Sequence, residues 1–293
     1  LSSLLSALTM YLFCRKLFSQ KSSILATALY VWAPYRAVDL YVRGALSEAF
    51  AFVFFPLIFY ASLLLANKIT LARVFFLSVS LAGLFLTHNV TTLIFLPFLF
   101  LWWLYLWIKQ KNWKLFLPFF ASFILALGLS ASFLFPAIFE REFIQTKYLL
   151  VGYFDFRAHF VAFYQFFSPF WGYGASLWGP KDDMSFQVGL AHWAVILLAL
   201  VVGLIKRNNK LAFLIPFLFF SFLLSIFLQH NKSAFLWEAI PLMAFIQFPW
   251  RFLAVSIFIV SLLGVSSTDY FTGKFKIIFF VLLASVILVN FNY

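Results

Sequence analysis

Long uncharged stretches dominate this sequence, and they leave few choices of fold. Of 293 residues, 65% are hydrophobic and only 10% are charged, whereas soluble domains carry about 25% charged residues. In lipid, the backbone must satisfy its own hydrogen bonds, so apolar stretches of about 20 residues predict membrane-crossing helices. We therefore expect an all-α fold, a polytopic transmembrane helical bundle.

The apolar stretches predict about ten spans in a single membrane domain over residues 1–293. They lie at about 1–14, 22–34, 46–66, 72–87, 90–108, 115–135, 187–205, 211–228, 250–269 and 277–290. The first two are shorter than a full span. Because the chain begins inside one apolar stretch and stops just after another, we expect it to be a fragment of a longer protein.

Basic residues distinguish the two ends of this bundle. Thirteen of the 21 Lys and Arg residues lie in one alternating set of connections, with Asp269 as the only nearby acid. The other connections hold eight basic and eight acidic residues and include a long loop at about 136–186. By the positive-inside rule, the first set is cytoplasmic and the long loop is extracytoplasmic. Because the positive charge is divided among short loops and forms no single basic patch, the composition does not indicate a nucleic-acid partner.

Residues 34–48 hold the densest group of charges between uncharged stretches. Arg36, Asp39, Arg43 and Glu48 lie here, and a helix after Pro34 would place Asp39 and Arg43 on one face. One interpretation is an interfacial ion pair that fixes a span end. The other is a site in which the arginines bind an anionic headgroup or phosphate and a carboxylate acts as a base or metal ligand.

Two further groups of polar residues fall on the same predicted face. His88 closes the fourth span, where it could accept a proton or bind phosphate, while Asn89 is expected to cap the fifth helix. In the long loop, Asp155, Arg157 and His159 precede an aromatic tract at 163–178. These aromatics could stack on sugars or mark an interfacial helix, which is the commoner case.

The remaining polar positions have ordinary structural interpretations beside any functional one. Lys181, Asp182 and Asp183 match no metal-ligand pattern and are expected in a solvated turn. At the start of the ninth span, Trp250 and Arg251 follow a proline suited to a helix start, and Arg251 either snorkels to the interface or binds an anion.

Some kinds of chemistry find little support in the sequence. One cysteine allows neither an internal disulfide nor a thiolate metal cluster. No ionised residue falls at the middle of a predicted span, where proton- or sodium-coupled transporters usually place one. Charges at one rim suit an interfacial active site better than a conduction path.

Five motifs together carry a resemblance that covers nearly the whole chain. They are Pro-Tyr-Arg-x-x-Asp-x-Tyr-x-Arg-Gly-x-x-x-Glu at 34–48, Thr-His-Asn at 87–89, Phe-Asp-Phe-Arg-x-His-Phe at 154–160, Met-Ser-Phe-Gln-x-Gly at 184–189 and Phe-Pro-Trp-Arg-Phe-Leu at 248–253. The sequence resembles the membrane family named after 6-pyruvoyl-tetrahydropterin synthase, which is similar to GT-C glycosyltransferases. No residue pattern here indicates pterin chemistry.

The resemblance implies a GT-C-like fold in the plasma membrane and a site on the extracytoplasmic side. It implies a polyprenyl-phosphate-linked sugar as donor, and membrane lipid around the chain. The acceptor would be a glycan, lipid or protein of the cell envelope. No cofactor is required, although a divalent metal ion is compatible with such a site. GT-C enzymes carry their catalytic carboxylate in the first outer loop, which we expect to precede Leu1.

On this resemblance we assign candidate roles by residue. The candidate catalytic residues are Asp39, Glu48, His88 and His159. The candidate substrate-binding residues are Arg36, Arg43, Asp155, Arg157, Trp250 and Arg251. Two other hypotheses stay open, a flippase or transporter of a lipid-linked glycan and a noncatalytic membrane scaffold.

Overall fold

The computed structural model describes residues 1–140, 143, 145, 148, 150–205, 213–268 and 276–290, and this part of the chain is helical without a named strand. The longer helices are α1 (Ser2–Cys14), α2 (Gln20–Val31), α5 (Phe54–Asn67), α6 (Leu71–Thr87), α7 (Asn89–Gln110), α8 (Phe116–Leu129), α9 (Ala131–Phe139), α10 (Leu190–Ile205), α11 (Leu214–Gln229), α13 (Leu253–Thr268) and α14 (Lys276–Val289). The expected all-α class is confirmed.

Short helices connect the longer ones. They are α3 (Pro34–Ala37), the π-helix η1 (Val38–Val42), α4 (Leu46–Ala51), α12 (Ala234–Ala239) and the 3-10 helices η2 (Trp113–Leu115), η5 (Gly152–Phe154), η6 (Phe156–His159), η7 (Phe163–Phe166), η8 (Asn231–Ser233), η9 (Pro241–Ile246) and η10 (Pro249–Phe252).

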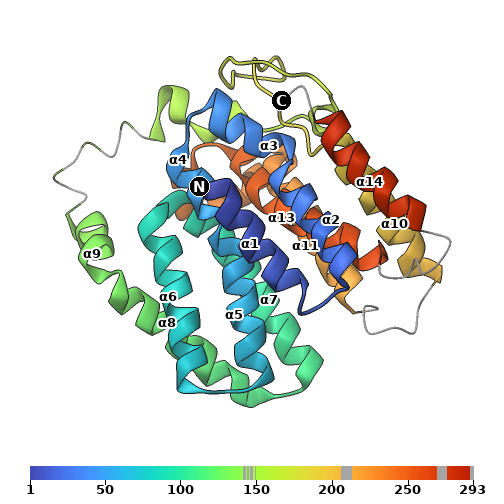
Figure 1. Cartoon of the computed structure of the whole chain (residues 1–293). Coiled ribbons are helices and arrows are strands. Elements are labelled where there is room, and N and C mark those ends of the chain that lie inside the picture. Colours follow the sequence, from blue (N-terminus) through green and yellow to red (C-terminus); the bar gives the residue numbers. More distant parts are fainter. Residues whose placement is uncertain are drawn as a thin grey trace.

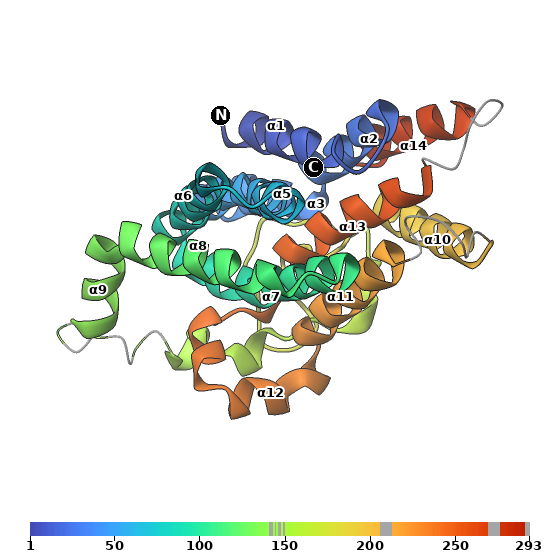
Figure 2. The ribbon, with the colours of Figure 1, turned by 90° about the horizontal axis from the view of Figure 1, so that it is seen from below.

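Helix α13 forms the centre of the molecule (Figure 1) and contacts α2, α10 and α11. Its residues from Leu253 to Val265 are buried. A second group consists of α5 to α8, and α1 joins the two groups because it contacts both α2 and α5. Turned by 90°, α1, α2 and α14 lie on one side and α12 on the other (Figure 2).

Local chemistry explains where several of these helices begin and bend. Ser19 caps α2 and Thr70 caps α6, because the side-chain oxygen of each accepts a hydrogen bond from a backbone N–H in the first turn of the helix. Pro56 in the first turn of α5 has no N–H to offer the Phe52 carbonyl, and the Tyr30 hydroxyl donates to that oxygen at 2.7 Å instead. A buried tyrosine on α2 thereby ties α2 to the α4–α5 break.

The expected helices occur, but few are long enough to cross a membrane alone. Within the described residues, two helical stretches have the length and apolar character of a span, Leu46–Asn67 and Asn89–Gln110. Counting two bent helix pairs as single spans raises this number to four, and five more apolar helices have 10–17 residues. The expectation of about ten spans is therefore supported for helix positions and only in part for membrane crossing.

Two predicted boundaries shift by a few residues. The helix expected from about residue 250 begins at Pro249 as the 3-10 turn η10 and becomes α-helical at Leu253. The long loop does not begin at 136, because α9 continues to Phe139 after a bend of 76° from the preceding helix. Arg141, Glu142, Lys147, Lys206, Arg207, Lys210, Asp269 and Lys274, which entered the charge argument, lie outside the described residues.

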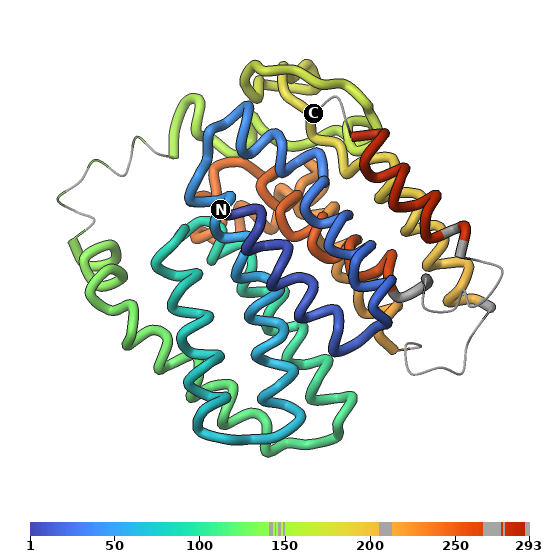
Figure 3. The backbone as a smooth tube through the Cα atoms, viewed as in Figure 1, coloured from blue at the N-terminus to red at the C-terminus, as the bar shows by residue number. Residues whose placement is uncertain are grey.

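From α1 to α8, the helix connections alternate between two ends of the molecule. Figure 3 shows the α1–α2, α5–α6 and α7–α8 connections at one end, with α3, α4 and the α6–α7 turn at the other. Arg15, Lys68 and Lys111 belong to the first end. The candidate residues of 34–48 and His88 belong to the second.

Candidate functional site

The backbone between α2 and α5 brings the charges of 34–48 together. In the π-helix η1, the Arg43 N–H donates to the Val38 carbonyl at 2.9 Å, five residues back. Gly44 then adopts a φ of 62°, a left-handed conformation that glycine reaches without strain. This turn reverses the chain, so that α4 returns Glu48 to Arg43.

The Arg43 guanidinium lies between two buried carboxylates. Its Nη1 donates to Asp39 Oδ1 at 2.5 Å and to Glu48 Oε2 at 2.9 Å. The Tyr35 hydroxyl donates to Glu48 Oε1 at 2.7 Å. Asp39 and Glu48 are 0% and 1% exposed, so solvent screens these interactions far less than at a surface. Four side chains from three short helices and a turn thus form one buried network.

Helix η10 adds a second arginine and an indole ring from 200 residues further along the chain. Arg251 Nε lies 3.9 Å from Glu48 Oε2, and its Nη1 donates to the Ile246 carbonyl at 2.9 Å. The Trp250 ring covers the Arg43 guanidinium, whose Cζ is 4.6 Å from the ring centroid. The motifs at 34–48 and 248–253 therefore meet in space.

We call Tyr35, Asp39, Arg43, Glu48 and Arg251 the arginine–carboxylate cluster. Arg43 uses only Nη1 in its hydrogen bonds within the described part of the chain, and Arg251 Nε is buried without a hydrogen-bond partner there. Each guanidinium carries five N–H donors in total, so several remain available. Both arginines therefore have N–H groups that no described residue accepts.

Burial shifts the pKa of Asp39, the carboxyl group of the cluster with an oxygen unpaired in the described part of the chain. Asp39 Oδ2 has no hydrogen-bond partner among the described residues. Burial, followed by the negative charge of Glu48, raises the pKa of the Asp39 carboxyl well above its ordinary value, against the opposing effect of Arg43. A carboxyl with a raised pKa and a free oxygen is suited to proton transfer.

Arg36 lies next to this cluster and faces other side chains. Its Nη1 donates to Ser6 Oγ at 3.3 Å, and its guanidinium Cζ lies 4.6 Å from the Phe52 ring centroid. Nε and Nη2 are buried without partners among the described residues, and burial lowers the pKa of Arg36. Arg36 thus adds positive charge near Asp39 from within the helix packing.

His88 has a structural role that the sequence had suggested for its neighbour. His88, and not Asn89, is the N-cap of α7, and its Nδ1 accepts the Thr91 N–H at 3.2 Å. An imidazole nitrogen can cap because its neutral form carries one acceptor lone pair. Burial lowers the pKa of His88, and the negative charge of Glu48 opposes this shift.

Among the described residues, the candidates in the long loop form no hydrogen bond or ion pair with the cluster, and His159 reaches it through Phe248, whose ring contacts both His159 and the Arg251 guanidinium. Arg157 is half exposed and pairs with Asp155 at 3.3 Å and with Glu238 of α12 at 3.2 Å. His159 is buried, with Nε2 at 2.5 Å from the Tyr153 carbonyl and Nδ1 at 2.8 Å from Ser176 Oγ. With both ring nitrogens engaged, His159 holds the loop together, and burial lowers its pKa.

Sequence reasoning missed three residues that the fold makes important. Tyr35 lies inside the first motif, and its position next to Arg36 and four residues before Asp39 was the available signal. Asp182 was expected in a solvated turn, but its carboxylate accepts hydrogen bonds from Gln165 Nε2 at 2.8 Å and from the Leu177 N–H at 2.8 Å. Phe186 stacks on Trp250 with ring centroids 5.7 Å apart and so connects the loop to the cluster.

Protein ligands for a metal ion do not gather in this site. Among the described residues, no group of three or more His, Cys, Asp or Glu side chains is placed to hold one. Asp39 and Glu48 both face Arg43, whose positive charge occupies the place a cation would take. A divalent ion bound here would therefore need oxygen ligands from a substrate.

Comparison with known proteins adds one relative. A protein of Lactococcus lactis subsp. cremoris (strain MG1363), described as uncharacterized, is 36% identical over 124 residues, which is 41% of this chain and 20% of that protein. The match thus spans about a fifth of the relative's length. No protein-family model matches the chain, and no solved structure matches it.

Proposed function

We propose that this chain is part of a multi-pass glycosyltransferase of GT-C type in the plasma membrane, acting at the extracytoplasmic side. It would transfer a sugar from a polyprenyl-phosphate donor to a glycan, lipid or protein acceptor of the envelope. The observation that carries the proposal is the arginine–carboxylate cluster, because it joins the first and last motifs of the resemblance in one buried, anion-binding arrangement.

Charge favours a phosphate as the ligand of this cluster. Arg36, Arg43 and Arg251 bring three guanidinium groups against the two carboxylates of Asp39 and Glu48. This leaves one formal positive charge, and more if Asp39 is protonated. Guanidinium groups bind phosphate oxygens through paired N–H donors, and in a desolvated site such bonds are strong. A lipid-linked phosphate would bring the compensating charge.

The surface of the molecule supports a membrane location. Large apolar side chains are exposed along α8, α9 and α14, among them Phe116, Leu117, Phe120, Phe135 and Ile277. Apolar surface of this extent is unusual for a soluble monomer and is expected where lipid covers a protein. The helix connections seen in Figure 3, together with the excess of basic over acidic residues that the sequence places in one set of connections, support the proposed orientation.

In the proposed reaction, an acceptor hydroxyl oxygen attacks the anomeric carbon of the donor. The bond between that carbon and the phosphate oxygen breaks, and the phosphate leaves with the bonding electrons. Arg43 and Arg251 stabilise the charge that develops on the phosphate. Asp39 is the proposed acceptor of the hydroxyl proton. Because its pKa is raised, only a minor fraction is ionised near neutral pH, so transfer should speed up as the pH rises. Glu48 holds Arg43 in place.

The other candidates have supporting places in this proposal. Trp250 fixes the Arg43 plane, and His88 adds an ionisable group within reach of Glu48. His159 supports the loop, and Asp155 and Arg157 would contact the acceptor at the exposed rim. A divalent metal ion, if required, would bind substrate phosphate together with a carboxylate.

The test uses the full-length protein in liposomes with a labelled polyprenyl-phosphate sugar and a range of envelope acceptors. We expect label transfer by the wild type and its loss in Arg43→Ala and Asp39→Asn. Arg15→Ala is the matched control, because Arg15 is an exposed arginine that bonds the Phe18 carbonyl at the opposite end. Movement of intact donor across the bilayer without transfer would support a flippase, and neither activity would support a scaffold.

A further inference from the structure

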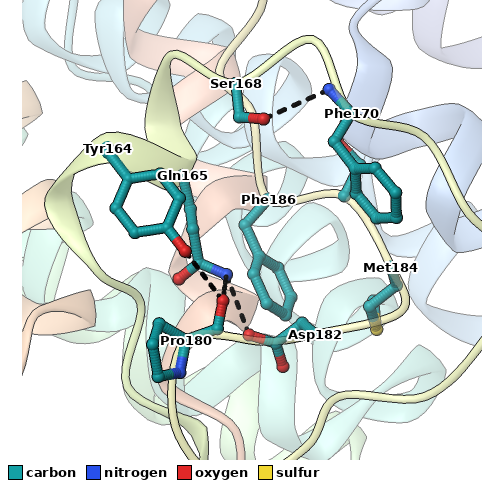
Figure 4. A pocket seen from close by; sticks show the side chains of 9 residues that line it. Tyr164, Gln165, Ser168, Phe170, Pro180, Asp182, Met184 and Phe186 are labelled. Atoms are coloured by element: carbon teal, nitrogen blue, oxygen red, sulfur yellow. Dashed lines mark hydrogen bonds between the residues drawn. The ribbon is translucent and has the colours of Figure 1, made fainter.

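A small polar pocket lies beside the arginine–carboxylate cluster, in the loop that follows η6. It has a volume of about 140 Å³ and is lined by residues of 164–186 (Figure 4). Its wall includes Phe186, whose ring stacks on Trp250, and Trp250 in turn covers Arg43. The pocket is therefore two aromatic rings away from the proposed phosphate site.

Aromatic side chains form the walls of this pocket. Tyr164 and Phe170 are 58% and 49% exposed, and in the close-up they stand on opposite sides of Phe186 (Figure 4). The Tyr164 hydroxyl donates to the Pro180 carbonyl at 2.9 Å, which fixes its ring. Aromatic faces carry partial negative charge, and the C–H bonds of a pyranose ring carry partial positive charge, so the two surfaces attract.

The polar groups of the pocket have hydrogen-bonding capacity to spare. Ser168 Oγ accepts the Phe170 N–H at 3.2 Å, and Ser185 Oγ accepts Gln187 Nε2 at 3.3 Å. In the described part of the chain neither hydroxyl donates a hydrogen bond that would occupy its proton. Asp182 Oδ2 accepts one bond, from Gln165, and retains a second lone pair. The pocket thus offers two donors and one charged acceptor to a ligand rich in hydroxyls.

The rest of the loop holds these groups in place before any ligand arrives. Gln165 is buried, donates to Asp182 and accepts the Ala162 N–H at 2.7 Å. Asp182 Oδ1 accepts from Ser176 Oγ at 3.0 Å, and Ser176 also contacts the buried His159. Sites whose polar groups are already oriented lose little entropy on binding. This loop is built around Asp182.

We propose that this pocket binds one pyranose ring. The volume suits a single sugar unit and is below the 300 Å³ or so of a pocket for a larger organic ligand. The combination of exposed aromatic faces, hydroxyl donors and a carboxylate matches a neutral sugar, whereas an anion would be repelled by Asp182. The inference rests on the proposed function only for the source of the sugar, which is either the lipid-linked donor or the acceptor glycan.

The experiment measures binding of methyl glycosides of glucose, galactose, mannose and N-acetylglucosamine to the full-length protein in nanodiscs by saturation-transfer NMR. We expect at least one glycoside to bind, and binding to weaken about three- to tenfold in Phe170→Ala and in Tyr164→Ala, the effect of losing one aromatic contact. Tyr173→Ala is the matched control, because Tyr173 is an aromatic residue of the same loop that is 72% exposed and lies outside the pocket lining. Thermal unfolding of each variant establishes that it is folded.

Several results would overturn this inference. Absence of binding by all four glycosides would do so, as would equal loss in Tyr173→Ala, which would indicate loose adhesion to loop aromatics. Quenching of loop fluorescence by brominated lipid, together with unchanged glycoside signals in the pocket variants, would assign Tyr164 and Phe170 to the membrane interface instead.

The same samples separate this inference from the proposed function. Glycoside binding without sugar transfer would retain the pocket and contradict the transferase proposal. Transfer that is unchanged in Phe170→Ala and Tyr164→Ala would contradict the pocket and retain the proposal. Addition of the polyprenyl-phosphate sugar distinguishes the two sources: displacement of the glycoside identifies the donor sugar, and simultaneous binding identifies the acceptor.

Discussion

Two arginines in this molecule each lie between two carboxylates, in opposite surroundings. Arg43 bridges Asp39 and Glu48 with its side chain 15% exposed, and Arg157 bridges Asp155 and Glu238 with its side chain 50% exposed. In water, an ion pair gains little over the separately hydrated charges. In a desolvated site, water cannot replace a missing charged partner, so removal of one side chain leaves the opposite charge buried and unpaired. The same residue types therefore make a rigid cluster in one place and a replaceable surface contact in the other.

The largest expected effect comes from removing the buried arginine. Arg43→Ala should lower the free energy of unfolding by about 3–5 kcal/mol, because it leaves Glu48 and Asp39 buried without their positive partner. Denaturant titration in mixed micelles measures this change. Adding Asp39→Asn and Glu48→Gln to Arg43→Met should restore much of the stability, since no unpaired charge then remains. A triple variant as unstable as Arg43→Ala would show that packing, and not charge, is responsible.

Removal of the Tyr35 hydroxyl should have the next largest effect. Tyr35→Phe deletes the 2.7 Å hydrogen bond to Glu48 and keeps the ring that packs on Phe52 and Trp250. A hydrogen bond to a charged group contributes about 1.5–3 kcal/mol. The same titration measures the loss. Tyr41→Phe serves as the control, because Tyr41 is 70% exposed and should change stability by no more than a few tenths of a kcal/mol.

The dependence of stability on pH tests the burial of His159. His159 shares η6 with Arg157 but is buried, and burial lowers its pKa in the folded state. As the pH falls below about 6.5, the ordinary histidine pKa, the unfolded chain binds a proton that folded His159 resists. Stability should therefore fall with pH, by at most about 1.4 kcal/mol per pH unit for one proton.

The contribution of His159 is isolated by difference. His88 also has a lowered pKa, so a variant without His159 should still lose some stability as the pH falls. We expect the stability of His159→Gln to depend less steeply on pH between about 7.5 and 5.5 than that of the wild type. Identical slopes in the two proteins would contradict the assignment of His159 as a neutral, buried group.

The smallest effect is expected at the exposed ion pair. Arg157→Ala should change the free energy of unfolding by about 0.2–1 kcal/mol, and the change should shrink further as salt is added. Unfolding titrations at low and high ionic strength provide the measurement. A loss as large as that of Arg43→Ala would remove the contrast between the two arginines and would indicate that the long loop is more rigid than its exposure suggests.

Much of the helical framework follows from the sequence alone. The uncharged stretches predict where the helices lie, because helix formation depends on hydrogen bonds between residues four apart and on local apolar character. The grouping of Arg36, Asp39, Arg43 and Glu48 was also readable, since these residues are neighbours in the chain. The local break at Pro249 shifted one boundary by a few residues, because a 3-10 turn precedes the α-helix there.

Tertiary packing decided which of those charges work together. Arg251 reaches Glu48 only because α13 contacts α3 and so brings η10 back to the first motif. Asp182 became a hydrogen-bonding centre through Gln165 and Ser176, which no local pattern joins to it. Arg43 and Arg157 look alike in the sequence, and only burial separates them. Burial is a property of the whole fold, because it depends on which distant segments exclude water from a side chain.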